Sequence, residues 1–312
     1  MHTPNQSGTS GLRVRHSVSH LPLLAGCLAG ICLATASAGD VSLANTTPNL
    51  AAQISSASVL YQPLLWVGTA PPTEPESAAL WEEVAGMKRE GVAARLPALE
   101  QFVAAYPDSP WTPSLRANLG RYYQEHARFR RALDHWEAAW KATRDMNEGT
   151  GKQVADYTFA YYTRTLAGLG ALEPLRALIE ETRDREFERG RVQEIFAETL
   201  TEYTGMLTQS DISFACGTYA LHHVLQTRKT PGYDGLALLR FRSPVTGFTL
   251  TRLAELARLH GAGLVAARWG QEKTLIVPSV VHWKAQHYAA ILEQKNGSYL
   301  VLDSVFGINR GG

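Results

Sequence analysis

The sequence predicts an α+β protein in which helices come first and a mostly antiparallel sheet follows. Residues 75–206 consist of long runs rich in Ala, Leu, Glu and Arg, which predict one helix after another. The runs are broken at Tyr106-Pro107, Asp145–Gly151 and Gly168–Gly170. From about Leu207 the pattern changes, because two helical stretches are followed by short runs of β-prone residues.

Residues 1–38 have the pattern of a secretory signal peptide. Arg13 and Arg15 precede an apolar run without any acidic residue, and the run ends in Ala36-Ser37-Ala38. The apolar part is shorter than the roughly 20 residues that a membrane-spanning helix needs. We therefore expect cleavage before Gly39 and export of the protein to a periplasmic or extracellular location.

The cysteines bear on the type of leader and on whether a disulfide can form. Leu24–Cys27 also resembles a lipoprotein box that would make Cys27 a lipid anchor, but apolar residues continue beyond it, so we favour the cleaved signal. Cleavage removes Cys27 and Cys32 and leaves Cys216 as the sole cysteine. An exported protein with one cysteine forms no internal disulfide, so Cys216 is either a reactive thiol or a buried apolar side chain.

The charge balance argues against nucleic acid as a partner. The formal net charge of the whole chain is +1, and loss of Arg13 and Arg15 with the leader changes it to −1. A nearly neutral chain has little electrostatic attraction for nucleic acid or for an anionic membrane. The basic cluster Arg128–Arg131 is interpreted as a solvated edge of a helix.

The helical part is predicted to begin after a linker and to contain a repeat. Residues 39–74 are rich in Ala, Ser, Thr and Pro and have few periodic apolar residues, which is typical of a linker. Small and aromatic residues in 75–206 recur after 34 positions, at Gly86 and Gly120, Ala98 and Ala132, Phe102 and Trp136, and Ala105 and Ala139. This spacing resembles tetratricopeptide repeats, although an ordinary helical bundle remains the alternative. Such arrays bind polypeptides on a concave face, so we expect a docking role for this part.

Residues 207–312 are predicted to hold two helices and several strands. One helix covers Cys216 to Gln226, and a second begins after a Thr249 or Thr251 cap and ends before Gly261. The strand-like runs are Leu264–Trp269, Leu275–Val277, Val280–Trp283, His287–Glu293 and Tyr299–Asp303. Asn296-Gly297 separates the last two runs, and Asn-Gly between apolar runs is a strong hairpin signal.

Three residues of this part have the types that nucleophilic catalysis needs. Cys216 begins a helix, where the backbone dipole favours a thiolate, while His287 opens one hairpin strand and Asp303 closes its partner. A thiol nucleophile needs a base, and the base needs a carboxylate to orient it. Counted from the turn, His287 and Asp303 lie near the same end of the hairpin but are not directly opposed in a two-residue register, and a longer or bulged turn could bring them together.

The same segments resemble a known family of enzymes. CGTYAL, GFTLTRLAELARLHGAGLVAARW, VHWKAQHYAAIL and YLVLDSVFG are similar to segments of the bacteriocin-processing cysteine peptidases, which are papain-like domains that cut leader peptides after a double glycine. The resemblance covers roughly residues 207–307. It implies that Cys216 is the nucleophile, that His287 is the general base and acid, and that Asp303 orients the imidazole.

The chain departs from the family in several ways. The family has a glutamine six residues before the cysteine that helps to bind the oxyanion, but this chain has Ser210 there and Gln209 one place earlier. We take Gln209 as the candidate donor. Asp303 is followed by Ser304 where the family usually has proline, and further strand-like sequence usually follows, which leaves open that 207–312 is a truncated domain. The chain has no ATPase motif, so we do not expect an exporter.

Other chemistries are less consistent with the sequence. His282 is the rival candidate for the base, and His222 and His223 are neighbours on a helix and cannot both face one metal ion. HExxH and CxxC motifs are missing, so we expect no metal and no cofactor. The alternatives to a cysteine peptidase are a catalytically inactive module that binds peptides in the same cleft, and an acyl transferase with the same three residues. Trp111, Trp136 and Trp140 are expected to pack between helices.

Overall fold

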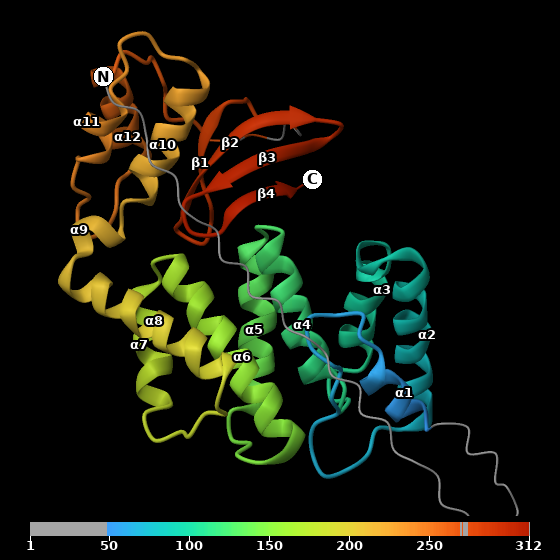
Figure 1. The fold of residues 1–312 in the computed structure, drawn as a ribbon. Helices are drawn as coiled ribbons and strands as arrows, with labels where there is room; N and C mark the ends of the chain where they lie inside the picture. The colour runs from blue at the N-terminus through green and yellow to red at the C-terminus, as the bar shows by residue number, and fades with distance from the viewer. Residues whose placement is uncertain (1–48, 269, 271–273, 312) are drawn as a thin grey trace, which may run out of the picture. The chain divides into compact units, whose positions relative to one another are not determined.

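A computed structural model of the chain describes residues 49–268, 270 and 274–311 (Figure 1). The expected signal peptide and the lipoprotein box around Cys27 lie outside the described residues. The described residues belong to one compact unit, Thr46–Gly312, which contains both the helices and the sheet. Contacts between the helical part and the sheet are therefore contacts within a single unit.

The first described segment differs from the linker expected for residues 39–74. It forms the helix α1 (Leu50–Ser56), and the chain that follows packs into the core of the helical part. Leu64 is buried there, and the backbone N–H of Gln62 donates a hydrogen bond of 2.9 Å to Oδ1 of Asn118. Its few apolar residues thus pack against helices that lie far along the chain. Local composition does not show such contacts.

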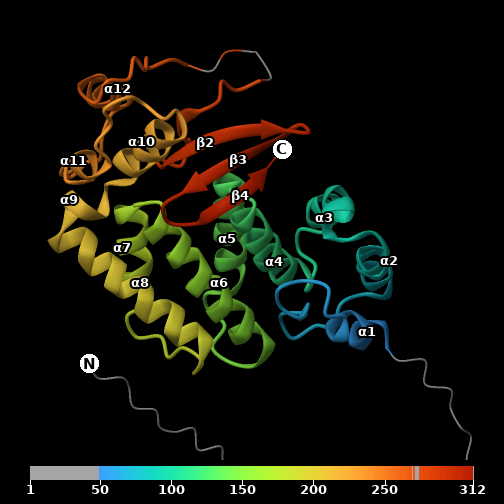
Figure 2. The same ribbon diagram turned by 45° about the horizontal axis from the view of Figure 1, so that its top comes forward.

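The prediction of consecutive helices is confirmed for residues 75–206. They are α2 (Glu74–Glu90), α3 (Val92–Ala105), α4 (Thr112–Glu125), α5 (Phe129–Thr143), α6 (Gly149–Gly168), α7 (Leu172–Glu181) and α8 (Arg191–Thr208). Figures 1 and 2 both show α4, α5 and α6 side by side, and helices that are neighbours in sequence pack against each other.

A close helix approach involves Gly120 of α4 and Trp136 of α5. A Cβ atom at Gly120 would lie 2.7 Å from Cδ2 of the Trp136 ring, so only glycine permits this distance. Trp136 is fully buried, as are Trp111 and, nearly, Trp140, which confirms the expected packing role of these tryptophans. At Gly86, the position 34 residues earlier, the corresponding space is filled by the side chain of Arg95 instead.

The C-terminal part confirms an α+β arrangement with an antiparallel sheet. Its helices are α9 (Ser210–Ser213), α10 (Cys216–Thr227), α11 (Gly235–Leu239) and α12 (Leu250–Leu259). Its strands are β1 (Ser279–His282), β2 (Tyr288–Lys295), β3 (Ser298–Asp303) and β4 (Gly307–Gly311). In the described chain they pair in the order β1-β2-β3-β4, and all three pairings are antiparallel.

Two predicted strands are wrong in the described residues. The runs Leu264–Trp269 and Leu275–Val277 contain no described strand residue, and Val265 and Ile276 are 87% and 84% exposed. The described residues of both runs therefore lie outside the paired strands of the sheet. β4 is a strand that the sequence did not predict, and it pairs with β3 after a short turn at Ser304–Phe306.

The sheet is buried on both faces along β2. Tyr288 and Ala290 pack in a cluster with α10, which lies beside β2 in Figures 1 and 2, whereas Ala289 and Ile291 pack with Val301 on the other face. This double burial explains the nearly continuous apolar run in this strand. Among the described residues, no helix is both long and apolar enough to cross a membrane.

Candidate active site

His287 and Asp303 form a buried hydrogen-bonded pair. Nε2 of His287 lies 2.8 Å from Oδ2 of Asp303, and the two residues are 1% and 2% exposed. The second carboxylate oxygen, Oδ1, accepts hydrogen bonds from the backbone N–H groups of Val305 and Phe306, at 2.9 and 3.1 Å. Both oxygens of Asp303 are thus occupied, and the carboxylate is fixed in one orientation.

A β-bulge at Leu292 places the two side chains on the same face of the sheet. Glu293 pairs with Leu300, but the next pair is Ile291 with Val301, so Leu292 is an extra residue in β2. Continued by one residue, the shifted register sets Asp303 opposite Ala289, two residues from His287. Residues two apart share a face, and long side chains reach across the diagonal. Without the bulge, the separation would be three residues and the side chains would lie on opposite faces.

The turn between β1 and β2 sets the position of His287. Gln286 has a positive φ of 61°, its N–H donates to the carbonyl of Trp283, and the N–H of Trp283 donates to the carbonyl of His287. This is a three-residue hairpin loop that closes directly before β2. The rival base, His282, lies on the other side of the loop with its ring stacked on Tyr288 at 4.3 Å, and it is His287 that bonds Asp303.

Cys216 is the first residue of α10, and its thiol is free and half-buried. The helix begins close to its neighbours because the next residue is Gly217, where a Cβ atom would lie 3.0 Å from Leu253 and 3.5 Å from Tyr288. The loop before Cys216 is held by Ser243, whose hydroxyl donates to the carbonyl of Phe214. The position of Cys216 is therefore fixed by contacts of the residue after it and of the loop before it.

The Cys216 thiol lies within interaction distance of the His287 ring. Burial acts to lower the pKa of His287, but hydrogen bonds to Asp303 and Cys216 and their negative charges outweigh burial and raise this pKa to about 9. Because Asp303 occupies Nε2, the ring atom left for the thiol is Nδ1. The three residues selected from the sequence thus come together, with the imidazole between the sulfur and the carboxylate.

Gln209 does not join this group. It is exposed and connects α8 to α9, and its backbone N–H donates to the carbonyl of Gly205 at 2.7 Å. Among the described residues, its side chain makes no hydrogen bond to Cys216 or His287. The site therefore brings together the expected nucleophile, base and carboxylate, whereas the side chain of the expected glutamine donor is exposed and is not hydrogen-bonded to them.

Two aromatic residues at the site were missed in the sequence. The ring of Phe129 lies 6.2 Å from that of His287, and the ring of Phe306 lies 6.0 Å from it, both edge to face. Phe129 is 2% exposed, although Arg130 and Arg131 beside it are exposed, as expected for a solvated helix edge. A single phenylalanine inside a basic cluster was the available signal that this edge also contacts another element.

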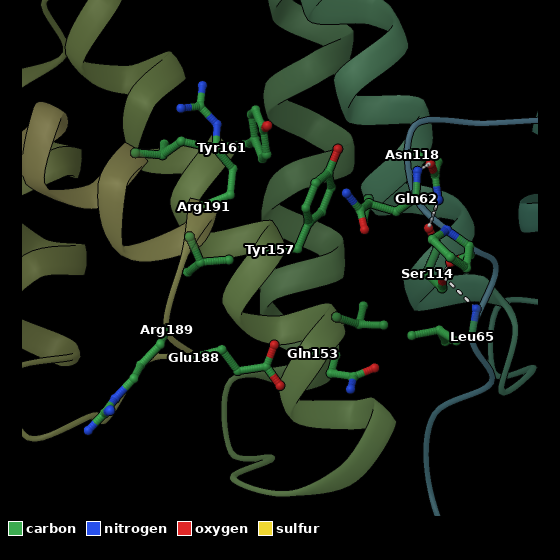
Figure 3. A pocket seen from close by; sticks show the side chains of 15 residues that line it. Gln62, Leu65, Ser114, Asn118, Gln153, Tyr157, Tyr161, Glu188, Arg189 and Arg191 are labelled. Carbon is green, nitrogen blue, oxygen red and sulfur yellow. Dashed lines mark hydrogen bonds between the residues drawn. The ribbon is translucent and has the colours of Figure 1, made fainter. Parts of the chain in front are cut away.

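A pocket of about 340 Å³ lies elsewhere, within the helical part (Figure 3). Figure 3 shows Tyr157 and Tyr161 projecting from α6 between Arg191 of α8 and Asn118 of α4. The remaining wall is the segment after α1, whose Leu65 N–H donates to the hydroxyl of Ser114 at 3.0 Å. Across the described residues no group of three or more His, Cys, Asp or Glu side chains could hold a metal ion.

The chain was compared with protein-family models, with curated proteins and with solved structures, and none of them matches it.

Proposed function

We propose that this protein is an exported cysteine peptidase of papain-like architecture with Cys216, His287 and Asp303 as its catalytic residues. The observation that supports this proposal most directly is the buried His287–Asp303 hydrogen bond beside a free cysteine at a helix N-terminus. A thiol, a base in contact with it and a carboxylate that orients the base are the parts of an activated nucleophile.

Each residue has one role in the proposed reaction. In the resting pair, Nδ1 of His287 holds the proton that the Cys216 thiol has given up, and the resulting thiolate attacks the carbonyl carbon of a peptide bond. The backbone N–H of Cys216, at the positive end of α10, stabilises the developing oxyanion. His287 then gives the proton to the leaving amine, and water releases the acyl group from the sulfur. Asp303 holds the ring tautomer and stabilises the imidazolium throughout.

The helical part is proposed to be a tetratricopeptide-like module that docks a polypeptide. Side chains of α4 already bind irregular backbone there, because Asn118 accepts from the N–H of Gln62 and Ser114 accepts from that of Leu65. The pocket beside this segment is lined by the tyrosines of α6 and by Arg191, which offer aromatic surface and hydrogen-bond donors to a further segment. A second polypeptide without helical structure would use the same kinds of contact.

Substitution of the nucleophile tests the proposed activity. Cys216→Ala should lower the cleavage of a susceptible peptide by about 10³-fold or more, because the covalent step is lost. The circular dichroism spectrum should remain that of the native protein, since a half-buried sulfur contributes little to packing. Cleavage at the native rate by folded Cys216→Ala would show that another residue performs the reaction.

Alkylation of Cys216 by iodoacetamide tests the site without a known substrate. The thiolate is the reacting form, so the native protein should be alkylated well below pH 7. In His287→Ala the reaction should follow an ordinary thiol, with half of the full rate at about pH 8.5. Equal pH profiles for the two proteins would contradict activation of Cys216 by His287.

One observation favours an inactive, peptide-binding module as the second candidate. Gln209 is exposed and its side chain is not hydrogen-bonded to Cys216 or His287, and loss of one oxyanion donor lowers the rate by about 10²–10³. An inactive module would bind peptides in the cleft with no cleavage, and iodoacetamide would react with Cys216 as with an ordinary thiol. The two measurements above therefore distinguish the candidates.

A further inference from the structure

We infer that the helical part completes the proposed active site, with Phe129 of α5 and Gly168 of α6 as positioning residues that hold and shield the His287–Asp303 pair. This inference deepens the proposed function and rests on it. It assigns to the helical part a role in the reaction centre in addition to the docking of polypeptides.

Phe129 and Phe306 form the shield. Their rings lie 4.6 Å apart, and each approaches the His287 ring edge to face. Phe129 is the first residue of α5, and its ring is buried away from the basic residues beside it. The two phenylalanines therefore cover one side of the imidazole with apolar surface from two different elements.

Gly168 allows Phe306, one ring of this shield, to pack closely against α6. A Cβ atom at Gly168 would lie 2.6 Å from Cζ of Phe306 and 2.8 Å from a methyl carbon of Val305. The N–H groups of these same residues hold Oδ1 of Asp303. A shift of this turn would therefore move the donors that fix the carboxylate, although Gly168 itself touches neither Asp303 nor His287.

The chemical consequence is exclusion of water from the hydrogen bond between Nε2 and Oδ2. A hydrogen bond to a charged group is stronger in a dry, apolar environment than in water. Water that reached this bond would compete for both partners and loosen the orientation of the ring toward the thiol. Misplacement of a catalytic group by about 1 Å can reduce the rate by about 10²-fold.

The readout for this inference is the proton that His287 shares with Asp303, observed by proton NMR in the full chain. A ring N–H that is hydrogen-bonded to a buried carboxylate gives a low-field resonance and exchanges slowly with water. Loss of the resonance in Asp303→Asn assigns it. In Phe129→Ala we expect exchange with water to become at least about tenfold faster, because the bond is opened to solvent. For a peptide that the native enzyme cleaves, kcat should fall while KM remains unchanged.

Matched variants separate positioning from general loss of packing. Phe129→Leu keeps apolar bulk and should keep slow exchange. Phe187→Ala removes a phenyl ring that stacks on Phe159 at 4.7 Å, away from the site, and should leave the resonance unchanged. Should Phe129→Ala fail to fold, Gly168→Ala provides the second test, because it displaces Phe306 and should accelerate exchange in the same way.

The outcomes also separate this inference from the proposed function. Native exchange in folded Phe129→Ala or Gly168→Ala, with peptide cleavage retained, overturns the positioning role and leaves the peptidase intact. A native protein that cleaves no peptide, but whose resonance responds to these variants as expected, overturns the peptidase and leaves the shielding of the pair intact.

Discussion

His287 experiences two opposing effects. Burial disfavours the charged imidazolium, whereas the Asp303 carboxylate and the Cys216 sulfur favour it, and the second effect is larger because the pKa rises to about 9. An imidazolium is thus the resting form of this ring at neutral pH. Its charge is held between two groups that are themselves fixed by backbone, Asp303 by the turn after β3 and Cys216 by the start of α10.

This shift makes the stability of the protein depend on pH. The folded-state pKa of His287 is raised from an unfolded value near 6.5, so its contribution is fully present below about pH 6.5 and is lost as pH rises through about 9. The loss should be about 3 kcal/mol at most, from a shift of this size. Urea unfolding of the native protein and of His287→Gln between pH 6 and pH 10 measures it. The free energy of unfolding should decline more steeply in the native protein, and parallel declines would contradict the shift.

At this scale the sequence identifies residue types better than residue contacts. Cys216, His287 and Asp303 could be selected because catalysis by a thiol restricts each position to a few side chains. Gln209 was selected by its distance in sequence from Cys216, but a helix boundary between α8 and α9 directs it to solvent. The position of Phe129 inside a basic cluster indicated only that this edge contacts another element, and its partner His287 could not be identified because it lies 158 positions away.

Among the elements, the β2–β3 hairpin shows where local sequence determines structure and where it does not. Asn296 and Gly297 have φ values of 51° and 77°, the left-handed backbone that an Asn-Gly turn favours, and this hairpin could be predicted. The bulge at Leu292 could not, because its residue type is ordinary for a regular strand. From the sequence, a longer or bulged turn could bring His287 and Asp303 together, whereas in the structure the irregularity lies inside β2, at Leu292.

The contact between α4 and α5 gives a test at the scale of two helices. Gly120→Ala places a Cβ atom 2.7 Å from the buried ring of Trp136, which cannot move without disturbing the core. We expect a loss of about 1–3 kcal/mol in the free energy of unfolding, from overpacking. Gly205→Ala is the matched control in α8, since its Cβ atom would have an ordinary contact of 3.4 Å with Ser213.

The control should be neutral or stabilising by up to about 1 kcal/mol, because alanine is the better helix former. Urea unfolding of both variants compares the two glycines directly. In the double variant Gly120→Ala with Trp136→Leu, the smaller side chain should remove part of the clash, so that the two losses are not additive. Equal stabilities for Gly120→Ala and Gly205→Ala would mean that α4 and α5 can separate without cost.

On the scale of the whole molecule, the order of helices before sheet could be predicted, but the contacts between them could not. Periodicity shows which segments are helices and where apolar faces lie, yet it does not show which distant face each one covers. The segment 57–67 illustrates this, because its composition indicates a linker while Leu64 and Val67 are buried in the helical core. Scattered apolar residues are thus as fully buried as periodic ones when they pack against the helices.

The contacts between helices and sheet also predict how the molecule unfolds. Chains of more than about 150 residues commonly unfold in several steps, domain by domain. In this chain Phe129 packs on His287, Gly168 on Phe306 and Gly170 on Phe214, so that loss of the helices removes support from the site. We therefore expect urea to abolish helical circular dichroism and the low-field resonance of the His287–Asp303 hydrogen bond in one transition with one midpoint. Gly168→Leu, which forces α6 and the turn after Asp303 apart, should separate the two midpoints, with the resonance lost first. Loss of most of the helical circular dichroism in the native protein while the resonance persists would show that the sheet and its site are stable without the helices, and the site would then belong to the C-terminal part alone.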